Sequence, residues 1–398
     1  MIAGDRRAGW RACVTTGADV TNVANVRGTS RRPNPVITVA LVVAVLFTLL
    51  GKQAVDAPAA EPDRGTGPAG PNVAFTPLTP GAKPPQFVLF SFDGSGSHDK
   101  WREFLAAAEQ VGAQFTGFLS GVYLLTAEHT DRYVGPGHEP GESSIGFSGT
   151  PQELRQLIDD LNTAYLRGHE IGTHYNGHFC DGNDPSGNDW TTAQWSAELD
   201  QFDQFLADYR TLNDLPDLPG LVFGPADIQG GRTPCLEGDP AVFFPALAAH
   251  GQSYDSSRPV TGLIWPQQLH GLWEFGMPVV PVRATDGKNI AMDYNFWYQF
   301  NGAVDEPARA EEFTAAVLET YESMYDAAFH GNRAPLVIGN HFNDWSGNAF
   351  NPAAEQFMLD VCDNPDTICT TYQNVIAWMD AQDPGVLAEL MALPPSGA

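Results

Sequence analysis

Apolar runs of strand length alternate with amphipathic, capped helices over about 300 residues of this 398-residue chain. Because a strand that is followed by a helix usually returns as a parallel strand, this alternation predicts a mainly parallel sheet with helices outside it. The pattern alone does not separate a barrel from an open doubly wound sheet. In either fold a functional site lies beyond the carboxyl ends of the strands, so residues that follow strand runs are the candidates for chemistry.

The expected elements follow from apolar runs and from helix caps. Strands are predicted at 87–92, 114–119, 169–174, 221–224, 252–254, 279–282 and 336–338. Helices are predicted at 101–111, 150–167, 191–209, 308–329 and 370–379. Thr150 with Glu153 and Thr191 with Gln194 form capping boxes that begin two of these helices.

The N-terminal part is predicted to direct the chain to a membrane. Residues 36–51 are apolar, two arginines precede them, and acidic residues follow them. This charge order favours an N-terminus inside the cell and a body outside it. A run of this length suits a signal peptide, whereas a full span needs about 20 residues, so a cleaved signal and an anchor both remain open. A buried core helix is the alternative.

The domain boundaries follow from composition. We expect a basic cytoplasmic leader over 1–35 and a hydrophobic segment over 36–51. A linker rich in Pro, Gly and Ala follows over 52–85, because proline removes hydrogen-bond donors and favours extended chain. One folded domain is expected over 86–385, with a C-terminal tail over 386–398. The expected location is therefore extracytoplasmic, either secreted or anchored.

Charge and cysteines limit the partners and the compartment. The formal net charge is -27, and such a surface repels phosphate backbones, so nucleic-acid binding is excluded. Membrane contact is expected only through the N-terminal segment. Four cysteines lie in the folded domain, an even number that favours pairing in an oxidising compartment. We favour Cys362 with Cys369 as a local closure and Cys180 with Cys235 as a tie between two loops; four buried free thiols are the alternative.

Several residues that carry chemistry follow strand runs. His174 and His178 form an HxxxH pair, whose ring nitrogens reach one metal ion if the backbone turns helically. Asp93 ends the first strand run, and His341 follows the last one as a candidate acid or base. A carboxylate clamp is one interpretation of Arg232, which lies in a turn-rich stretch. Asp255 is interpreted either as a residue of a turn or as a hydrogen-bond acceptor that supports another residue of the site. Each of these residues also has a structural interpretation, as a helix cap, a solvated surface charge or a satisfied loop residue.

Taken in order, these motifs resemble a known family. The motifs in the first half and at the end are residues 91–94 (SFDG), His174 with His178, residues 232–234 (RTP) and His341. Further similarity lies at residues 254–257 (YDSS), 273–274 (WE) and 292–294 (MDY). The set resembles the polysaccharide deacetylase homology domain, carbohydrate esterase family four, and its second half is similar to the chitin-deacetylase-like branch. The resemblance covers about residues 86–379.

The resemblance implies a fold and a set of roles. It implies an α/β fold, a distorted (β/α) barrel of about seven strands, and a divalent metal, usually zinc, with cobalt or another divalent ion as alternatives. Asp93 then matches the general base, and His174 with His178 matches the metal ligands. Arg232 matches the residue that orients the base. His341 matches the general acid, and Asp255 matches the acid that tunes His341.

The chain departs from the family pattern at the metal site. Gly94 stands where the family has an aspartate that binds the metal. Cys235 replaces a tyrosine, and Gly339 replaces a leucine. The first hypothesis is a metal-dependent hydrolase that removes N- or O-linked acetyl groups from a polysaccharide. The second is a protein that keeps the groove and binds glycan without hydrolysis, with Trp190, Trp265, Trp297 and Trp345 as candidate stacking residues in both cases. A hydrolase of another substrate on the same fold is the third.

Overall fold

Strand β1 (Gln86–Gly94) pairs with three other strands in a computed structural model that describes residues 68–397. The other strands are β2 (Thr116–Leu119), β3 (Glu170–Thr173), β4 (Gly230–Gly231), β5 (Tyr254–Asp255), β6 (Pro259–Thr261), β7 (Gln267–Leu269), β8 (Leu272–Glu274), β9 (Met277–Val282), β10 (Gly287–Ile290), β11 (Leu336–His341) and β12 (Thr367–Cys369). The α-helices are α1 (His98–Val111), α2 (Pro151–Leu166), α3 (Thr192–Leu212), α4 (Pro240–Ala249), α5 (Asp293–Asn301), α6 (Ala310–His330), α7 (Trp345–Asn348), α8 (Asn351–Val361), α9 (Tyr372–Asp380) and α10 (Pro384–Met391).

The main sheet is mostly parallel, as the alternation of strands and helices predicts. Its strand order is β11-β1-β2-β3-β4-β5-β8-β7, and β12 also pairs with β1, which makes nine strands. Only β7 runs antiparallel to its neighbour, at one edge of this sheet. A second sheet has the order β10-β9-β6. The sheet curls as a distorted (β/α) barrel but stays open, since within residues 68–397 no strand pairing joins β7 to β11.

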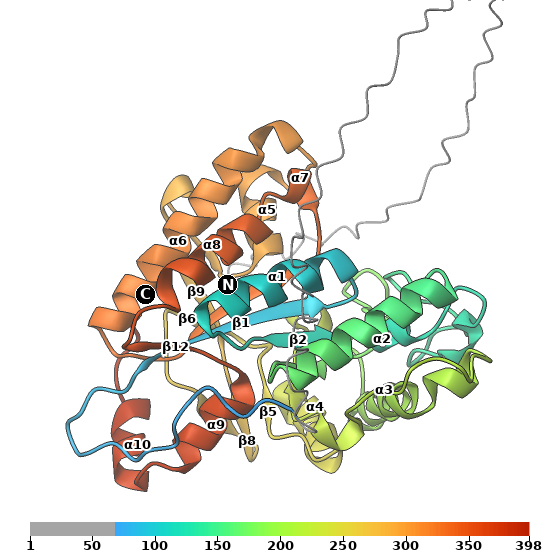
Figure 1. Ribbon diagram of the computed structural model, residues 1–398, viewed down its shortest axis with the longest axis horizontal. Coiled ribbons are helices and arrows are strands. Elements are labelled where there is room, and N and C mark those ends of the chain that lie inside the picture. The colour runs from blue at the N-terminus through green and yellow to red at the C-terminus, as the bar shows by residue number, and fades with distance from the viewer. Residues whose placement is uncertain (1–67, 398) are drawn as a thin grey trace, which may run out of the picture. The chain divides into compact units, whose positions relative to one another are not determined.

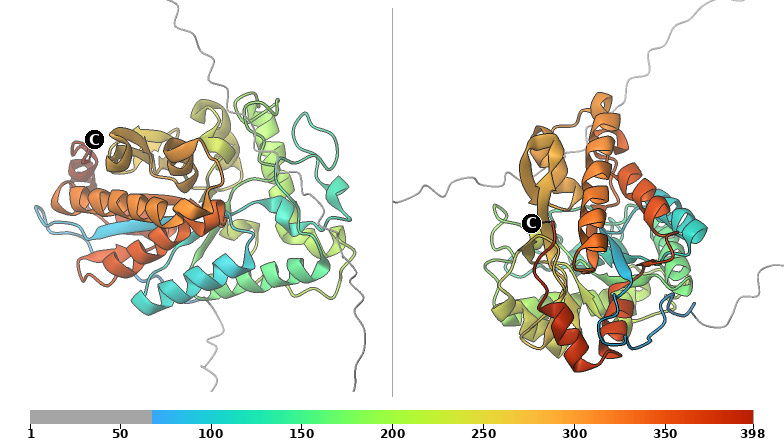
Figure 2. Two further views of the ribbon diagram at one scale, coloured as in Figure 1. Left: turned by 90° about the horizontal axis from the view of Figure 1, so that it is seen from above. Right: turned by 90° about the vertical axis from the view of Figure 1, so that its left-hand side faces the viewer.

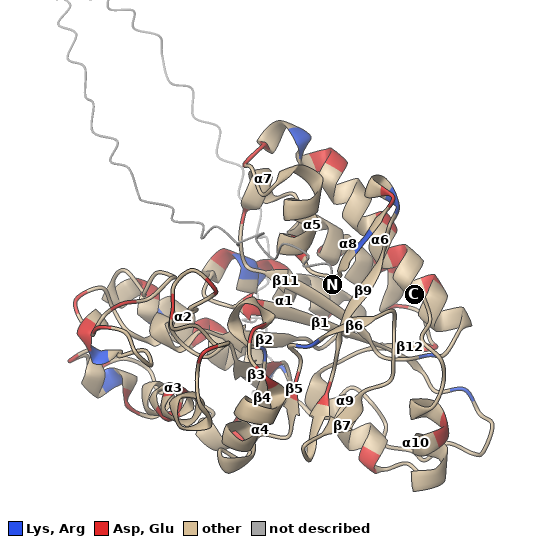
Figure 3. Cartoon of the chain, turned by 180° about the vertical axis from the view of Figure 1, so that it is seen from behind, with Lys and Arg blue, Asp and Glu red and all other residues tan. Residues whose placement is uncertain are grey.

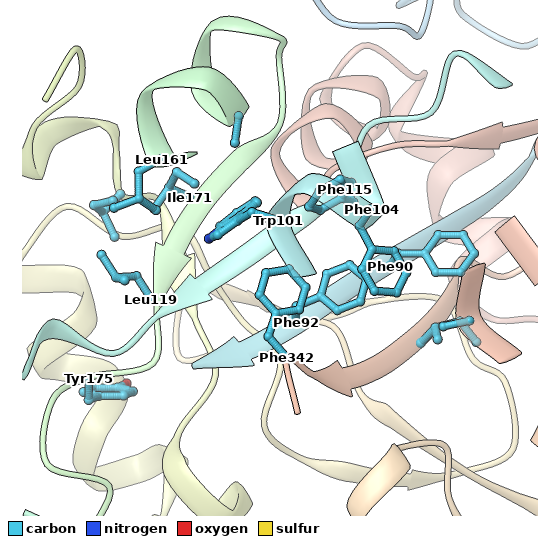
Figure 4. Packing of buried hydrophobic residues seen from close by; sticks show 14 of the residues in the cluster. Phe90, Phe92, Trp101, Phe104, Phe115, Leu119, Leu161, Ile171, Tyr175 and Phe342 are labelled. Carbon is cyan, nitrogen blue, oxygen red and sulfur yellow. The ribbon is translucent and has the colours of Figure 1, made fainter. Parts of the chain in front are cut away.

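Both faces of β1 are buried, and its side chains alternate between two apolar clusters. Val88, Phe90 and Phe92 belong to the cluster under the outer helices, where the rings of Phe92 and Phe104 of α1 lie 4.2 Å apart (Figure 4). The residues between them face the other way, and Phe87 packs on Trp378 of α9. Because strand side chains alternate with a period of two, Ser91 and Asp93 share the face of Phe87 and not that of Phe92.

Helices cover the outer face of the sheet next to β1. Helix α1 packs between α8 and α2 (Figure 1). Helices α6 and α8 both contact β11 and lie beside the strands in the further views (Figure 2). The predicted capping boxes are present at Thr150 with Glu153 and at Thr191 with Gln194, so α2 and α3 begin where the sequence indicates.

Some sequence predictions differ from the structure. No strand forms at 221–224, where the side chain of Phe223 instead packs a loop against Tyr165 of α2. Helix α9 is capped by Thr371, one residue after the start of the helix predicted at 370–379. Both predicted disulfides are confirmed, Cys180–Cys235 and Cys362–Cys369.

The segments on either side of the predicted domain belong partly to it. The leader 1–35 and the apolar segment 36–51 lie outside the described residues. The part of the predicted linker from residue 68 onward contacts the domain, since Asn72 donates from Nδ2 to the carbonyl of Cys369 at 2.8 Å. The predicted tail 386–398 continues α10, and Ser396 pairs with Leu263 through their backbones. None of the helices described is long and apolar enough to cross a membrane.

Candidate functional site

The carboxyl ends of β1, β3, β4 and β11 meet and bring the predicted site residues together. In the parallel register Asp93 lies opposite His341, the last residue of β11. On the other side of β1, Thr173 pairs with Gly231, so the residues that follow them, His174 and Arg232, are neighbours. Asp93, His174, Arg232 and His341 therefore converge as the parallel fold requires.

Arg232 and Asp93 form a fully buried ion pair. The guanidinium Nη1 donates to Asp93 Oδ1 at 2.8 Å, and both side chains are within 2% of complete burial. Arg232 also donates to the hydroxyls of Ser91, Ser256 and Tyr372 at 3.0 Å and to the carbonyl of Ser256 at 2.8 Å. Since every one of these bonds is charge-assisted, the arginine fixes the carboxylate in one position.

The charges around Asp93 keep it ionised. Burial raises the pKa of Asp93, but the positive charge of Arg232, with smaller contributions from two histidines, outweighs burial. The pKa therefore lies below its ordinary value. Arg232 contacts Oδ1 of this carboxylate, and the role of Asp93 as a general base stays a prediction.

His174 has the geometry of a metal ligand. It is 2% exposed, and its Nδ1 lies 2.8 Å from the carbonyl oxygen of Arg232. Because a carbonyl only accepts, Nδ1 carries the proton and Nε2 carries the lone pair. That Nε2 atom is buried and has no hydrogen-bond partner. Burial lowers the pKa of His174 to about 4, so the ring is neutral at pH 7, as metal binding requires.

His178 lies beside His174 and is partly buried. The centroids of the two rings are 5.1 Å apart. Burial lowers the pKa of His178 to about 3. Two neutral imidazoles therefore lie side by side, and Nε2 of His174 is buried without a hydrogen-bond partner, which is compatible with the predicted metal site.

The cysteines near His178 are not ligands. Among the described residues, one group of three His, Cys, Asp or Glu has its ligand atoms within 4.8 Å of one another, namely His178, Cys180 and Cys235. The two sulfurs form a disulfide, and Cys180 Sγ lies 3.6 Å from His178 Nδ1. The disulfide therefore connects the loop that carries His178 to the loop that follows Arg232.

Position 94 supplies no third donor. Gly94 has φ +84°, in the left-handed region where side chains on L-residues are strained. A Cβ on this residue would lie 3.6 Å from the hydroxyl of Tyr123, which is an ordinary van der Waals contact, so the backbone conformation and not the space restricts this position. The residues present therefore fit a metal ion that His174 and His178 would hold through their ring nitrogens.

Asp293, and not Asp255, is the acid that contacts His341. Asp293 Oδ1 lies 2.7 Å from His341 Nδ1, and its Oδ2 accepts from the backbone N–H of His341 at 2.7 Å. Burial lowers the pKa of His341, but the charge of Asp293 outweighs burial, and the pKa lies above its ordinary value. A protonated His341 is therefore favoured, which suits a proton donor.

Asp255 supports the backbone next to Arg232. Its two carboxylate oxygens accept from the N–H and the hydroxyl of Ser257 at 2.8 Å. The Ser257 hydroxyl in turn accepts from the backbone N–H of Thr233 at 2.8 Å. The predicted role for Asp255 at His341 is corrected because its strand pairs it with Glu274 of β8, away from β11.

Asp255 and Glu274 form a buried carboxyl pair. Burial raises the pKa of Asp255 above its ordinary value. Burial and the charge of Asp255 raise the pKa of Glu274 further, so at neutral pH Glu274 holds the proton. Two adjacent carboxylates cannot both ionise in such a place, and one shared proton stabilises the pair.

Of the four candidate tryptophans, Trp345 alone remains partly exposed. Trp190, Trp265 and Trp297 are 4%, 1% and 5% exposed and belong to the core. The centroid of the Trp345 ring lies 5.0 Å from that of His341, and Trp345 stacks on Trp297 at 5.1 Å. An apolar ring face therefore lies next to the proposed proton donor.

Sequence reasoning missed Asp293 and the hydroxyls that surround Arg232. Asp293 does lie in the segment 292–294 that resembles the family, but its partner could not be read from the sequence order. Ser91 has a signal of its own, because it is a polar residue inside an apolar strand two positions before Asp93. Tyr372 comes from a helix that begins 140 residues after Arg232 in the chain, and it gives no local signal.

No protein-family model matches the chain, and no curated protein matches its sequence. Solved structures are similar in fold. A Mycobacterium smegmatis protein assigned as a polysaccharide deacetylase has 16% identity and a TM-score of 0.47, over 81% of this chain and 98% of that one. The chitin deacetylase of Colletotrichum lindemuthianum has 14% identity and a TM-score of 0.37, over 81% and 93%. A CE4-family pseudoenzyme from Bacillus anthracis has 8% identity and a TM-score of 0.40, over 78% and 71%.

Because Glu274 holds a proton in the carboxyl pair, we expect the stability of the protein to depend on pH, and we expect Glu274→Gln to remove this dependence. The folded protein holds a proton on Glu274 above the ordinary pKa of 4.5, where the unfolded chain releases it, so the free energy of unfolding falls as the pH rises. We expect Glu274→Gln to remove a slope of about 1.4 kcal/mol per pH unit from about pH 5 to about pH 8. Urea unfolding at several pH values measures both slopes.

The control for this measurement is Glu389→Gln, which changes an exposed glutamate of α10. Its slope should match that of the wild type. Equal slopes for Glu274→Gln and the wild type would show that Glu274 carries no proton of its own in the folded protein.

Proposed function

We propose that this chain is an exported, metal-dependent hydrolase that removes N- or O-linked acetyl groups from a polysaccharide. The observation that carries the proposal is the convergence, at one edge of the sheet, of a carboxylate base, a histidine pair and a protonated histidine. These are Asp93 held by Arg232, His174 with its orphaned Nε2 beside His178, and His341 held by Asp293. The ordered motifs that resemble carbohydrate esterase family four support the same activity.

The side chains divide the hydrolysis between them. His174 and His178 would hold a divalent ion, with zinc the first candidate, and such an ion would supply Lewis-acid polarisation of the acetyl carbonyl. Asp93 takes the proton of the water that adds to the carbonyl carbon. His341 gives a proton to the leaving nitrogen or oxygen as its bond to that carbon breaks, and the products are acetate and a free amine or hydroxyl.

The surroundings of the site favour a neutral glycan. The partly exposed ring of Trp345 beside His341 offers a stacking face for a sugar ring. Acidic residues are spread over the helices and loops, whereas lysine and arginine are few (Figure 3). A net charge of -27 repels anionic polymers, which favours a chitin-like chain over an acidic wall polymer.

The second candidate function is glycan binding without hydrolysis. Gly94 is the observation that favours it, because glycine has no side chain to supply a third protein donor at this position. Structural and catalytic zinc sites ordinarily use three or four protein ligands, and two histidines hold the ion less tightly. In this second function the protein would bind a glycan at Trp345 and would not hydrolyse it, because it would hold no metal ion.

Export is proposed from the pattern at the N-terminus and from the disulfides. Both disulfides lie within the described domain, and such bonds persist in oxidising compartments outside the cytoplasm. The apolar segment 36–51 with its preceding arginines supports an N-terminus inside the cell.

Acetate release tests the hydrolase. The purified full-length protein with added Zn²⁺ or Co²⁺ should release acetate from acetylated chitooligosaccharides, with acetylxylan and peptidoglycan assayed beside them. We expect His174→Ala to lower kcat/KM by about 100-fold or more, because the variant loses one of two metal donors.

Two outcomes separate the candidate functions. No release by the wild type from any of the three polymers, together with oligosaccharide binding in calorimetry, would contradict the hydrolase and favour glycan binding. Release that His174→Ala leaves unchanged would exclude the proposed metal site, whatever the substrate.

Trp345 tests the sugar-stacking surface. We expect Trp345→Ala to raise KM for an acetylated oligosaccharide by about five- to tenfold, because a stacked ring contributes about 1 kcal/mol. The kcat for a small acetyl ester without a sugar should change little. Trp345→Phe keeps an aromatic face and serves as the control; a KM for Trp345→Ala equal to that of the wild type would rule out stacking at this residue.

Surface labelling tests export. Lys83 is exposed on the described domain, so an amine-reactive biotin that cannot cross membranes should label the domain on intact cells that produce the full chain. Labelling should be as complete in intact cells as after lysis. A domain that is labelled only after lysis would place it in the cytoplasm.

A further inference from the structure

A carboxylate from outside the site holds the loop between the two proposed metal ligands. Glu198 of α3 is fully buried, and its Oε1 accepts from the backbone N–H of Asn176 at 3.0 Å and of Gly177 at 3.4 Å. The side-chain amide of Asn176 donates in turn to the backbone carbonyl of Glu198 at 2.7 Å. One helix residue therefore satisfies three polar groups of the loop.

Tyr133 completes this anchor. Its hydroxyl donates to the Glu198 carboxylate at 3.0 Å and accepts from the backbone N–H of Gly177 at 3.0 Å. A Cβ on Gly177 would lie 2.4 Å from that hydroxyl, so the loop fits against Tyr133 only with glycine at this position. The backbone carbonyl of Gly177 is also held, because it accepts from the backbone N–H of Ser144 at 2.8 Å.

The loop needs such an anchor because its backbone is strained. Tyr175 and His178 both have φ +55°, in the left-handed region that bulky L-residues avoid. Such conformations persist only where the surrounding structure determines them fully. The left-handed turn at His178 also sets the direction of its ring, so the anchor and the metal ligand are parts of one arrangement.

The place of Glu198 on its helix indicates a specific task. Trp195, Leu199 and Phe202 surround it on the buried face of α3. A carboxylate on an apolar face costs free energy unless it is paired. The hydrogen bonds that offset this cost come from Tyr133 and from the backbone of the loop between the two histidines.

We propose that Glu198 and Tyr133 are positioning residues, which fix the loop so that His174 and His178 present their nitrogens to one divalent cation. The inference rests on the proposed metal site. Residues that orient metal ligands typically change metal affinity by about 10- to 100-fold when they are altered. Here the hydrogen bonds act through the backbone between the ligands and not on the imidazole rings.

The chain contains a matched control pair. Tyr254 donates from its hydroxyl to the buried carboxylate of Glu170 at 2.7 Å, as Tyr133 does to Glu198. The other hydrogen bonds of Glu170 go to Thr116 and to the backbone of Gln373. Tyr254→Phe therefore removes an equivalent hydroxyl from a buried carboxylate without touching the histidine loop.

The experiment compares Tyr133→Phe with Tyr254→Phe in the full chain. Each variant is titrated with Co²⁺, followed by visible absorption, and with Zn²⁺ in competition with a chromogenic chelator. We expect Tyr133→Phe to weaken binding of both ions by about tenfold or more and to change the Co²⁺ spectrum. Tyr254→Phe should stay within about twofold of the wild type. Thermal unfolding shows that both variants are folded.

The outcomes separate this inference from the proposed function. Metal binding by the wild type that Tyr133→Phe leaves unchanged overturns the inference alone. No binding of either ion by the wild type overturns the proposed metal site and this inference with it. If Tyr133→Phe does not fold, Glu198→Gln and Glu198→Ala decide, because glutamine keeps the acceptor for Asn176 and alanine removes it. Equal affinities in those two variants contradict the positioning role.

Discussion

The buried ion pair of Arg232 and Asp93 determines how the rest of the site is arranged. Charges without water are costly unless they are paired and fully hydrogen-bonded, and removing one partner of such a pair costs about 3–5 kcal/mol. Arg232 meets this demand with Asp93 of β1, Ser256 after β5 and Tyr372 of α9, and its own carbonyl holds His174. Three separate segments are therefore fixed around one guanidinium, and the backbone carbonyl of the same residue holds the first histidine.

The parts of the fold that the sequence predicts well have strong local signals. The apolar run of β1 and the capping boxes of α2 and α3 are determined by neighbouring residues, so periodicity and caps find them. Strands β4 and β5 are two residues long and exist only through their pairing in the sheet. No period can be recognised in such a segment. The reverse error occurs at 221–224, where apolar side chains pack a loop and not a sheet.

The candidate site was predictable where residues follow long strands. Asp93 and His341 end β1 and β11, and parallel register brings them opposite each other without further information. Which acid reaches His341 depends instead on an isolated bridge between Met292 and Gly339, a contact between segments with no regular pattern. That bridge brings Asp293 beside the histidine, while Asp255 is directed to Glu274 by the neighbouring strand. The order of residues in the sequence does not show which of the two aspartates contacts His341.

The missing donor at Gly94 makes the anchored loop more important. A metal site with several protein ligands tolerates some freedom in each, because the remaining ligands hold the ion. The proposed site has two imidazoles, so motion of the loop between them can remove one of the two protein donors. Its affinity for a metal ion therefore depends on how well the two rings are held in place before the ion binds. Here the disulfide fixes the segment after His178, and the carbonyl of Arg232 fixes the ring of His174. Glu198 and Tyr133 hold the backbone between them, which leaves the pair little freedom to lose when it binds an ion.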